Sequence, residues 1–364
     1  MDIYIYIYNS SAMLLGITDV IASLKWTKRF FRGDDFTAVF PATEHNLSLI
    51  AKKRIIEVPN RYCGFITSLR ITTKNSSEVI IAKGVSIDGM LSRRIIAYGN
   101  TSDSLMELLD KNAGAASAYL HRAFENTVFD TDVSCEGMLS DILRYKSADR
   151  YVEIVGKAKG FGVKAEIVHS EDSIYNHIRF YGRYAADRSV NQSENTPVIF
   201  ADIYDSISEC GYFYSEAGEV NSIVLYSDPK PDYAENIDIP AYVGCTVPDS
   251  NTGYSVIERA VKTEPKIKYN IVTSGEKITY IPVLDTAAME AEADEYVHSN
   301  TAPPTDRMSG VLKISEDYTE RFDVGDIVTL CCKRWGIVKH ERICEITEVY
   351  DADGVSITAV TGGK

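Results

Sequence analysis

The sequence lacks the features that mark membrane proteins, exported proteins and the common hydrolases. No apolar run approaches the roughly eighteen residues that a membrane-spanning helix needs. The N-terminal residues carry neither a basic segment nor a small-residue cleavage site, so we expect a strand there and no export signal. No G-x-S-x-G or H-E-x-x-H motif occurs, and the six histidines show no motif spacing. We therefore expect a chain that is made and assembled in solution, without stable membrane anchoring.

Cysteine and basic residues are both scarce for a chain of this length. The seven cysteines are odd in number and scattered, so they do not form a disulfide framework and indicate a reducing compartment. The 52 acidic residues outnumber the 38 basic ones, and the formal net charge of −14 disfavours tight nucleic-acid binding through phosphate neutralisation. With 45% hydrophobic residues, the chain can bury a sizeable core, and its length predicts two or three domains.

The clearest structural pattern that is present lies near the C-terminus. Between residues 318 and 361, three short runs are rich in β-branched residues, and Asp351-Ala352-Asp353-Gly354 separates the last two. Such a separation is typical of a β-hairpin. The pattern predicts a small antiparallel barrel or sandwich. No catalytic group stands where such a module would present one, which favours a role in assembly.

The rest of the chain alternates between strand and helix patterns. Residues 2–8 alternate Ile and Tyr with period two, and residues 1–99 hold about five strand patterns, which predict a barrel or sandwich. The middle of the chain turns helical and then returns to strands, which predicts an α/β insertion inside a β-domain. We expect helices at 104–110, 113–123, 138–158 and 286–297, further strands at 163–168, 197–200, 221–226, 266–272 and 278–281, and a linker at 299–307.

Two groups of residues suggest metal chemistry, and both have a simpler explanation. Cys331, Cys332, His340 and Cys344 include no C-x-x-C pair, and adjacent residues in a strand point to opposite faces, so a zinc site is disfavoured. Asp351-Ala352-Asp353-Gly354 lacks the downstream glutamate of a calcium loop, so a hairpin turn explains it better.

The remaining candidates are also better explained by structural roles. Gly156, Gly160 and Gly162 follow a helix rather than a strand, which indicates a helix end and not a phosphate loop. Arg93-Arg94 is either an interface pair or a solvated strand end. We expect Trp26 and Trp335 in the core rather than at an interface. We predict no catalytic, cofactor-binding or metal-binding residue and no enzyme activity.

Five segments, taken in order along the chain, carry a resemblance to a known family. They are Ser23–Phe30 with Gly33, Phe36 and Phe40-Pro41; Gly64–Ile66; Gly84–Ile96; Asp187–Ser189 with Gln192, Asn195, Pro197, Ile199-Phe200 and Asn221; and Gly325–Val328 with Arg342, Ile343 and Glu345. In this order they resemble the siphophage tail-hub family, the structural part of tail-associated lysins and baseplate hub proteins.

The resemblance implies an α+β fold that is mainly β, with two tube-like antiparallel β-barrels and an α/β insertion, as in baseplate hubs. The first barrel would comprise residues 1–99 with 186–226, interrupted by the insertion at 100–185. The second would comprise 227–284 with 309–364, and 285–308 would form a helix and linker. Three such subunits would place six barrels around a channel.

The function that the resemblance implies is that of a structural phage tail-tip or baseplate hub protein. It would form a homotrimeric ring that joins the end of the tail tube to the tip and lines the DNA channel. Its expected partners are a distal tail protein or the tail tube, a tape measure protein, and a tip or fibre protein. We expect it in the virion tail tip after assembly in the host cytoplasm. Because the chain stops at Gly362-Gly363-Lys364, the lytic activity of longer relatives is not expected.

The alternative function is that of a β-rich cell-surface carbohydrate-binding protein or glycoside hydrolase. The 23 tyrosines could serve it by stacking on sugars. The two functions require different structures. A hub needs self-association and a tube partner, whereas a sugar binder needs an exposed aromatic platform or a carboxylate pair in a cleft.

Overall fold

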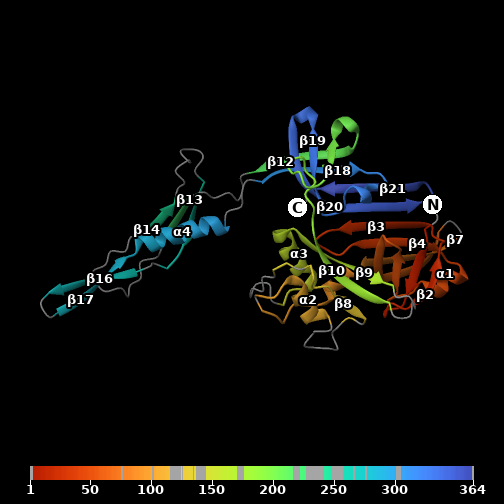
Figure 1. Cartoon of the computed structure of the whole chain (residues 1–364), viewed down its shortest axis with the longest axis horizontal. Coiled ribbons are helices and arrows are strands. Elements are labelled where there is room, and N and C mark those ends of the chain that lie inside the picture. Colours follow the sequence, from red (N-terminus) through yellow and green to blue (C-terminus); the bar gives the residue numbers. More distant parts are fainter. Residues whose placement is uncertain are drawn as a thin grey trace. The chain divides into compact units, whose positions relative to one another are not determined.

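Strands make up most of the fold, as the β-branched runs predict (Figure 1). The computed structural model describes residues 3–74, 77–100, 102–114, 124, 126–133, 135–136, 145–169, 176–215, 222–226, 242–246, 257–264, 267–274, 277–300 and 305–362. The chain divides into a first unit, Met1–Gly211 with Met308–Lys364, and a second unit, Tyr212–Arg307. Within the described ranges, no helix is long and apolar enough to cross a membrane.

One large sheet organises the first unit. Its thirteen strands are β1 (Ile5–Tyr8), β2 (Leu14–Thr18), β3 (Ser23–Arg29), β4 (Asp35–Pro41), β5 (Ile55–Val58), β6 (Tyr62–Lys74), β7 (Ser77–Ser86), β11 (Ile199–Ala201), β12 (Ile207–Ser215), β18 (Thr305–Lys313), β19 (Ile327–Cys332), β20 (Ile337–Asp351) and β21 (Gly354–Thr361). The main order is β12-β18-β21-β20-β3-β4-β7-β6-β5-β1-β2, and β19 pairs with both β20 and β11. Antiparallel pairing of β20 with β3 thus joins the two ends of the chain in one sheet.

Alternating burial along β1 shows how the sequence pattern becomes structure. Ile3, Ile5 and Ile7 are buried in one core, while Tyr4 is exposed and Tyr6 is partly buried, as the period-two prediction requires. Tyr8 departs from this pattern, because it is buried in the core of the insertion. In the core of the three isoleucines, Trp26 is fully buried and stacks on Phe36, with ring centroids 4.7 Å apart. The predictions of an N-terminal strand and of a core position for Trp26 are confirmed.

The inserted region between β7 and β11 contains helices and a small sheet of its own. Its elements are the 3-10 helix η1 (Asp88–Arg93), α2 (Leu105–Ala113), β8 (Thr127–Phe129), α3 (Ala148–Lys159), β9 (Phe161–Val168) and β10 (His177–Tyr184). Strand β10 pairs antiparallel with β9 and parallel with β8. The hydrophobic core of this region also contains Tyr8, Ile55 and Cys63 of the large sheet. The insertion is therefore packed directly on β1, β5 and β6.

Local signals set the ends of these helices. Ser104 and Glu107 form a capping box at the start of α2, and Gly160 ends α3 with a left-handed backbone (φ +67°). The predicted helix at 104–110 and the helix end at Gly160 are confirmed. The predicted start of the helix at 138–158 is wrong over the described residues, because α3 begins at Ala148 after the N-cap residue Ser147 and Tyr145 has φ +65°. Residues 138–144 lie outside the described residues. Most of the predicted helix at 113–123 lies outside the described residues.

The C-terminal strands form the hairpin that the sequence predicts. Asp351 pairs with Gly354 across a two-residue turn, and Gly354 adopts φ +119°. The prediction of a buried Trp335 is wrong, because its side chain is 40% exposed. Trp335 ends the short 3-10 helix η6 (Lys333–Trp335) between β19 and β20. Gly336 then turns the chain with φ +67°, so this tryptophan stands at a strand connection rather than in the core.

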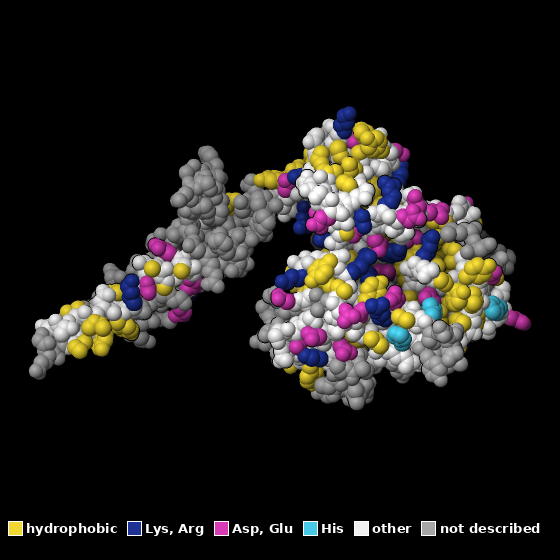
Figure 2. Space-filling view, viewed as in Figure 1, with side chains coloured by type: hydrophobic (Ala, Val, Ile, Leu, Met, Phe, Trp, Pro, Cys, Tyr) yellow, Lys and Arg dark blue, Asp and Glu magenta, His cyan; other side chains and the backbone are white. Residues whose placement is uncertain are grey.

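The remaining short helices of the first unit lie in the connections between its strands. They are α1 (Glu44–Leu49) and the 3-10 helices η3 (Asp202–Tyr204) and η5 (Tyr318–Glu320). On the face shown in Figure 2, acidic and basic side chains are interspersed over this unit.

The second unit contains short strands and one long helix. They are β13 (Ser222–Tyr226), β14 (Tyr242–Thr246), β15 (Glu258–Lys262), β16 (Ile267–Ser274), β17 (Lys277–Leu284) and α4 (Thr286–Asn300). The predicted helix at 286–297 is confirmed by α4. Residues 308–364 group with the first unit. The division of the chain into two barrels, the second made of 227–284 with 309–364, stays a prediction.

Candidate functional site

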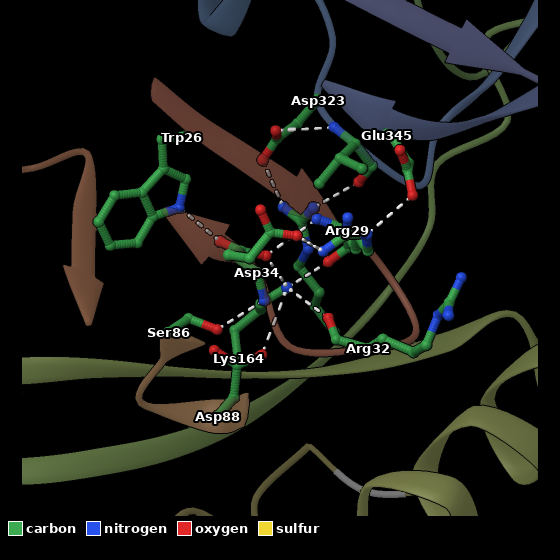
Figure 3. Close-up of polar contacts among 12 residues, drawn as sticks. Trp26, Arg29, Arg32, Asp34, Ser86, Asp88, Lys164, Asp323 and Glu345 are labelled. Carbon is green, nitrogen blue, oxygen red and sulfur yellow. Dashed lines mark hydrogen bonds and ion pairs between the residues drawn. The ribbon is translucent and has the colours of Figure 1, made fainter. Parts of the chain in front are cut away.

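A buried lysine fastens the insertion to the large sheet (Figure 3). The Lys164 ammonium, on β9, lies 2.9 Å from Asp34 Oδ1 and 3.5 Å from Asp88 Oδ2. It also donates hydrogen bonds to the backbone carbonyls of Arg29 and Arg32. Because a buried charge is tolerated only with close partners, these contacts make the ammonium a structural tie. We call Lys164, Asp34, Asp88, Trp26, Arg29 and Ser86 the Lys164 cluster.

Asp34 connects the other members of this cluster. Its carboxylate accepts hydrogen bonds from Trp26 Nε1 at 3.0 Å and from the Arg29 backbone N–H at 2.9 Å. Its own backbone N–H donates to Ser86 Oγ at 2.7 Å. The core tryptophan, the loop after β3 and the end of β7 are therefore held by one aspartate.

Electrostatics within the cluster follow from burial and from the lysine. Burial alone would lower the pKa of Lys164, but the carboxylates of Asp34 and Asp88 raise it above its ordinary value. Burial raises the pKa of Asp88 to about 6, although Lys164 acts in the opposite direction. The ammonium of Lys164 and the carboxylates of Asp34 and Asp88 thus stabilise one another inside the protein.

Arg29 and Arg183 connect the region around the Lys164 cluster to the C-terminal part of the chain. Arg29 Nε donates to Glu345 Oε1 on β20 at 2.7 Å. On β10, Arg183 Nη1 donates to Asp323 Oδ2 at 2.8 Å. The Arg183 guanidinium also stacks on the Phe30 ring, 5.3 Å from its centroid. Both strands of the β9–β10 hairpin are thus attached to segments that lie far away in sequence.

A second buried cluster surrounds a single carboxylate. Glu348 on β20 is almost fully buried, with Lys28 Nζ 3.1 Å from its Oε1 and the Tyr318 hydroxyl donating to the same atom at 2.6 Å. The Tyr350 hydroxyl donates to its other oxygen, and Arg61 Nη1 lies 3.4 Å from that oxygen. Burial would raise the pKa of Glu348, but Lys28 and the tyrosine hydroxyls lower it overall. This carboxylate stays charged and fully compensated, which suits a structural role.

An open cleft lies between the large sheet and the insertion. Its volume is about 690 Å³, and it is lined by β5, the turn into β6, β9 and β10. We call it the Tyr6 cleft, after a side chain that also lines a neighbouring hollow of about 240 Å³. Its polar and aromatic lining includes Tyr6, Glu57, Arg61, Glu166, His169 and Tyr181.

The charged groups of this cleft have partners within the chain. Glu57, at the buried side, accepts a hydrogen bond from the Tyr8 hydroxyl at 2.6 Å and lies 3.1 Å from His169 Nε2. Glu166 lies 3.6 Å from Arg179 on the paired strand. The cleft therefore offers polar atoms and ring surface, and each of its two carboxylates has a partner within the chain.

The residues that suggested metal chemistry are held in separate interactions. The ring nitrogens of His340 contact the Thr329 hydroxyl at 3.0 Å and the Asn191 amide at 2.8 Å. Cys332 is buried and Cys344 Sγ donates to a backbone carbonyl. Among the residues that the structure describes, no group of three or more His, Cys, Asp or Glu side chains could hold a metal ion.

The other candidates from the sequence also have structural surroundings. Arg93 ends the 3-10 helix η1, and the Arg94 guanidinium stacks on the Phe124 ring, 4.2 Å from its centroid. Gly156 lies inside α3, where a β-carbon would stand 2.4 Å from the Phe161 carbonyl oxygen. The sequence analysis did not single out Lys164 or the lining of the Tyr6 cleft. Tyr6 was predicted only as part of the N-terminal strand.

Comparisons with known proteins place the chain among phage proteins. The family model of the Siphovirus ReqiPepy6 Gp37-like protein matches residues 4–237, which is more than half of the chain. No sequence among curated proteins matches it.

Solved structures with a similar fold cover almost the whole chain. A tail protein from Neisseria meningitidis MC58 has a TM-score of 0.51 at 11% identity, over 99% of this chain and 97% of that chain. The prophage MuSo2 43 kDa tail protein from Shewanella oneidensis has a TM-score of 0.53 at 11% identity, over 99% and 98%. A chain of the phage P2 baseplate, in its activated conformation with Ca, has a TM-score of 0.51 at 9% identity, over 100% and 99%.

These findings confirm the tail-hub resemblance and the mainly β fold that it implies. At such low identities the solved structures show the fold alone, whereas the family model shows membership. The chain belongs to the Siphovirus ReqiPepy6 Gp37-like protein family and has the fold of phage tail and baseplate proteins.

Proposed function

We propose that this protein is a structural hub of a phage tail tip, in which three copies form a ring between the end of the tail tube and the tip. The ring lines the channel through which DNA leaves the particle. The observation that carries the proposal is the similarity in fold to a phage P2 baseplate chain over 100% of this chain and 99% of that one. Such agreement over full length fits a shared architectural role.

The partners and location follow from this position in the particle. The ring contacts a distal tail protein or the tail tube on one side and a tip or fibre protein on the other, with the tape measure protein at its channel. It belongs to the virion tail tip and assembles in the host cytoplasm. The formal net charge of −14 suits a channel that lets DNA pass without holding it.

Exposed apolar side chains on two different parts of the first unit support ring formation. One set is Leu15 and Ile17 on β2, the strand that ends the large sheet. The other, which we call the Trp335 patch, lies on neighbouring elements and consists of Ile199, Ile203, Tyr204, Trp335 and Val338. Large exposed apolar patches mark interaction sites, and contact between two different patches on successive copies forms a ring when the rotation between the copies closes.

The two buried clusters support a structural rather than an enzymatic role. Glu348 and Asp34 are the kind of buried carboxylate that a catalytic site would use, but each is bound by several donors of the same chain. Their contacts join strands that are distant in sequence. We therefore assign them to holding the subunit rigid within an assembly.

The mass of the purified protein in solution tests the proposal. Light scattering at several concentrations and salt levels should give three times the chain mass of 40.5 kDa. Replacing two residues of the Trp335 patch, Trp335→Ser with Val338→Ser, should shift the protein to monomer. The matched control is Val128→Ser, at an exposed apolar position on β8 outside the patch, and it should leave the trimer unchanged.

A monomer at every concentration, both alone and when mixed with the tail proteins encoded beside it, would contradict the trimeric hub. A trimer that survives the double substitution would move the interface away from the Trp335 patch and leave the hub intact.

A further inference from the structure

We propose that the Tyr6 cleft binds a neutral oligosaccharide, independently of the ring described above. The cleft, of about 690 Å³, lies within the ~300–1,000 Å³ that small-molecule sites occupy. It continues past Tyr6, Val58, Pro59 and Arg61 into the neighbouring hollow of about 240 Å³. The shared lining residues place the two hollows next to each other, so a chain of linked rings could occupy both.

The pairing of the charged groups favours a neutral ligand over an ion. Glu57 is held by Tyr8 and His169, and Glu166 lies opposite Arg179. Arg61 contacts Glu348 and the Tyr350 hydroxyl. A free cation or anion would find its natural partner already occupied. A phosphate-rich polymer would in addition meet the two carboxylates of the lining.

These paired groups still offer hydrogen bonds that a sugar can use. A carboxylate has about four lone-pair positions and a guanidinium has five N–H donors, so each retains capacity after one or two contacts. Asn60, exposed at the turn between β5 and β6, adds an amide with both donors and acceptors. Sugar hydroxyls both donate and accept, so this mixture of planar polar groups matches them.

Aromatic rings supply the apolar part of the recognition. Tyr6 and Tyr181 line the cleft and are only partly buried, so ring surface is available to a ligand. Tyr6 stands where the cleft meets the hollow, so a bound chain would cross it. Tyrosine offers an apolar ring next to a polar hydroxyl, which fits the C–H face and the hydroxyl edge of a sugar.

Calorimetric titration of the full chain with defined oligosaccharides tests this inference. The probes are chitotetraose with N-acetyl groups, cellotetraose and maltotetraose, each up to millimolar concentration, and a lysine-rich peptide represents a cationic ligand. We expect saturable binding of at least one oligosaccharide and none of the peptide. Tyr6→Ala and Glu166→Gln should each weaken that binding by about tenfold through lost stacking and hydrogen bonding.

Two further variants keep the result interpretable. Asn60→Gly removes an exposed side chain at the rim of the cleft and tolerates the left-handed backbone of this position (φ +59°), so it should weaken binding while the fold is kept. Tyr269→Ala removes an exposed tyrosine on β16, outside both the cleft and the Trp335 patch, and should leave binding unchanged. The proposal is overturned if no oligosaccharide binds, if binding is indifferent to the three cleft variants, or if only the peptide binds.

Discussion

Lys164 and Glu166 lie two residues apart on the same face of β9, yet their surroundings are opposite in character. The Lys164 side chain is 13% exposed and is enclosed by carboxylates and backbone carbonyls, whereas the Glu166 side chain is 46% exposed and faces an open cleft. One strand thus anchors the insertion at one point and lines a binding surface a few ångströms away. The comparison teaches that burial and close ionic partners, rather than position on the strand, separate the anchoring group from the group that lines the cleft.

The largest effect is expected at the anchored position. Lys164→Met keeps much of the side-chain volume but leaves Asp34 and Asp88 buried without their cation. We expect the free energy of unfolding to fall by about 3–5 kcal/mol, as for other broken buried ion pairs. Urea unfolding would measure this loss. The control is Lys157→Met, at a more exposed lysine on α3, which should change the free energy of unfolding only slightly. A loss below about 1 kcal/mol would show that the Lys164 cluster does not hold the insertion.

A pH effect of intermediate size follows from Asp88. Its folded-state pKa is raised to about 6, so between its ordinary value and pH 6 the folded state binds more protons than the unfolded state. Stability from this group is therefore greatest at low pH and is lost as pH rises through 6, with a slope of at most about 1.4 kcal/mol per pH unit. The measurement is unfolding of wild type and Asp88→Asn from pH 4 to 7, and the difference between them should carry this slope.

Asp205→Asn serves as the control for that series, because Asp205 is exposed and pairs only at the surface with Lys313. A flat difference for Asp88→Asn over this pH range would mean that Lys164 keeps the carboxyl ionised throughout.

The smallest effect is expected at the open position. Glu166→Gln removes one exposed charge whose ion pair with Arg179 spans 3.6 Å at the surface. We expect a change in the free energy of unfolding within about 0.5 kcal/mol. Thermal and urea unfolding of Glu166→Gln, measured alongside Lys164→Met, would compare the two losses in the free energy of unfolding directly. Similar losses of stability for both variants would contradict the distinction between Lys164 as a structural group and Glu166 as a cleft-lining group.

Local sequence signals predicted the elements whose causes are local. The Ile and Tyr alternation gave β1, Ser104 marked the start of α2, Gly160 marked the end of α3, and the Asp351–Gly354 turn gave the last hairpin. In each case the residues that determine the structure lie within a few positions of one another.

What the sequence could not show depends on contacts between distant residues. Pairing of β20 with β3 joins positions more than 300 residues apart, and Lys164 reaches Asp34 across 130 residues. No local pattern specifies either partner. Trp335 was placed wrongly for the same reason, because its exposure depends on how η6 sits between two strands of the finished sheet.

Packing explains two of the glycines that carried the family resemblance. A β-carbon on Gly33 would lie 2.2 Å from the Gly89 α-carbon, where the loop after β3 meets η1. Gly325 adopts φ +99°, and a β-carbon there would lie 2.2 Å from the Phe30 ring. Both glycines stand where segments distant in sequence come close together. The short motifs thus record contacts of the fold rather than chemistry.

Electron microscopy of the purified protein would test the central claim most directly. The account predicts averaged images of a ring with three-fold symmetry, two globular regions per subunit and an open central channel. Images that contain only separate single subunits at every concentration, or a closed assembly without a channel, would contradict the assignment of this chain as a tail-tip hub.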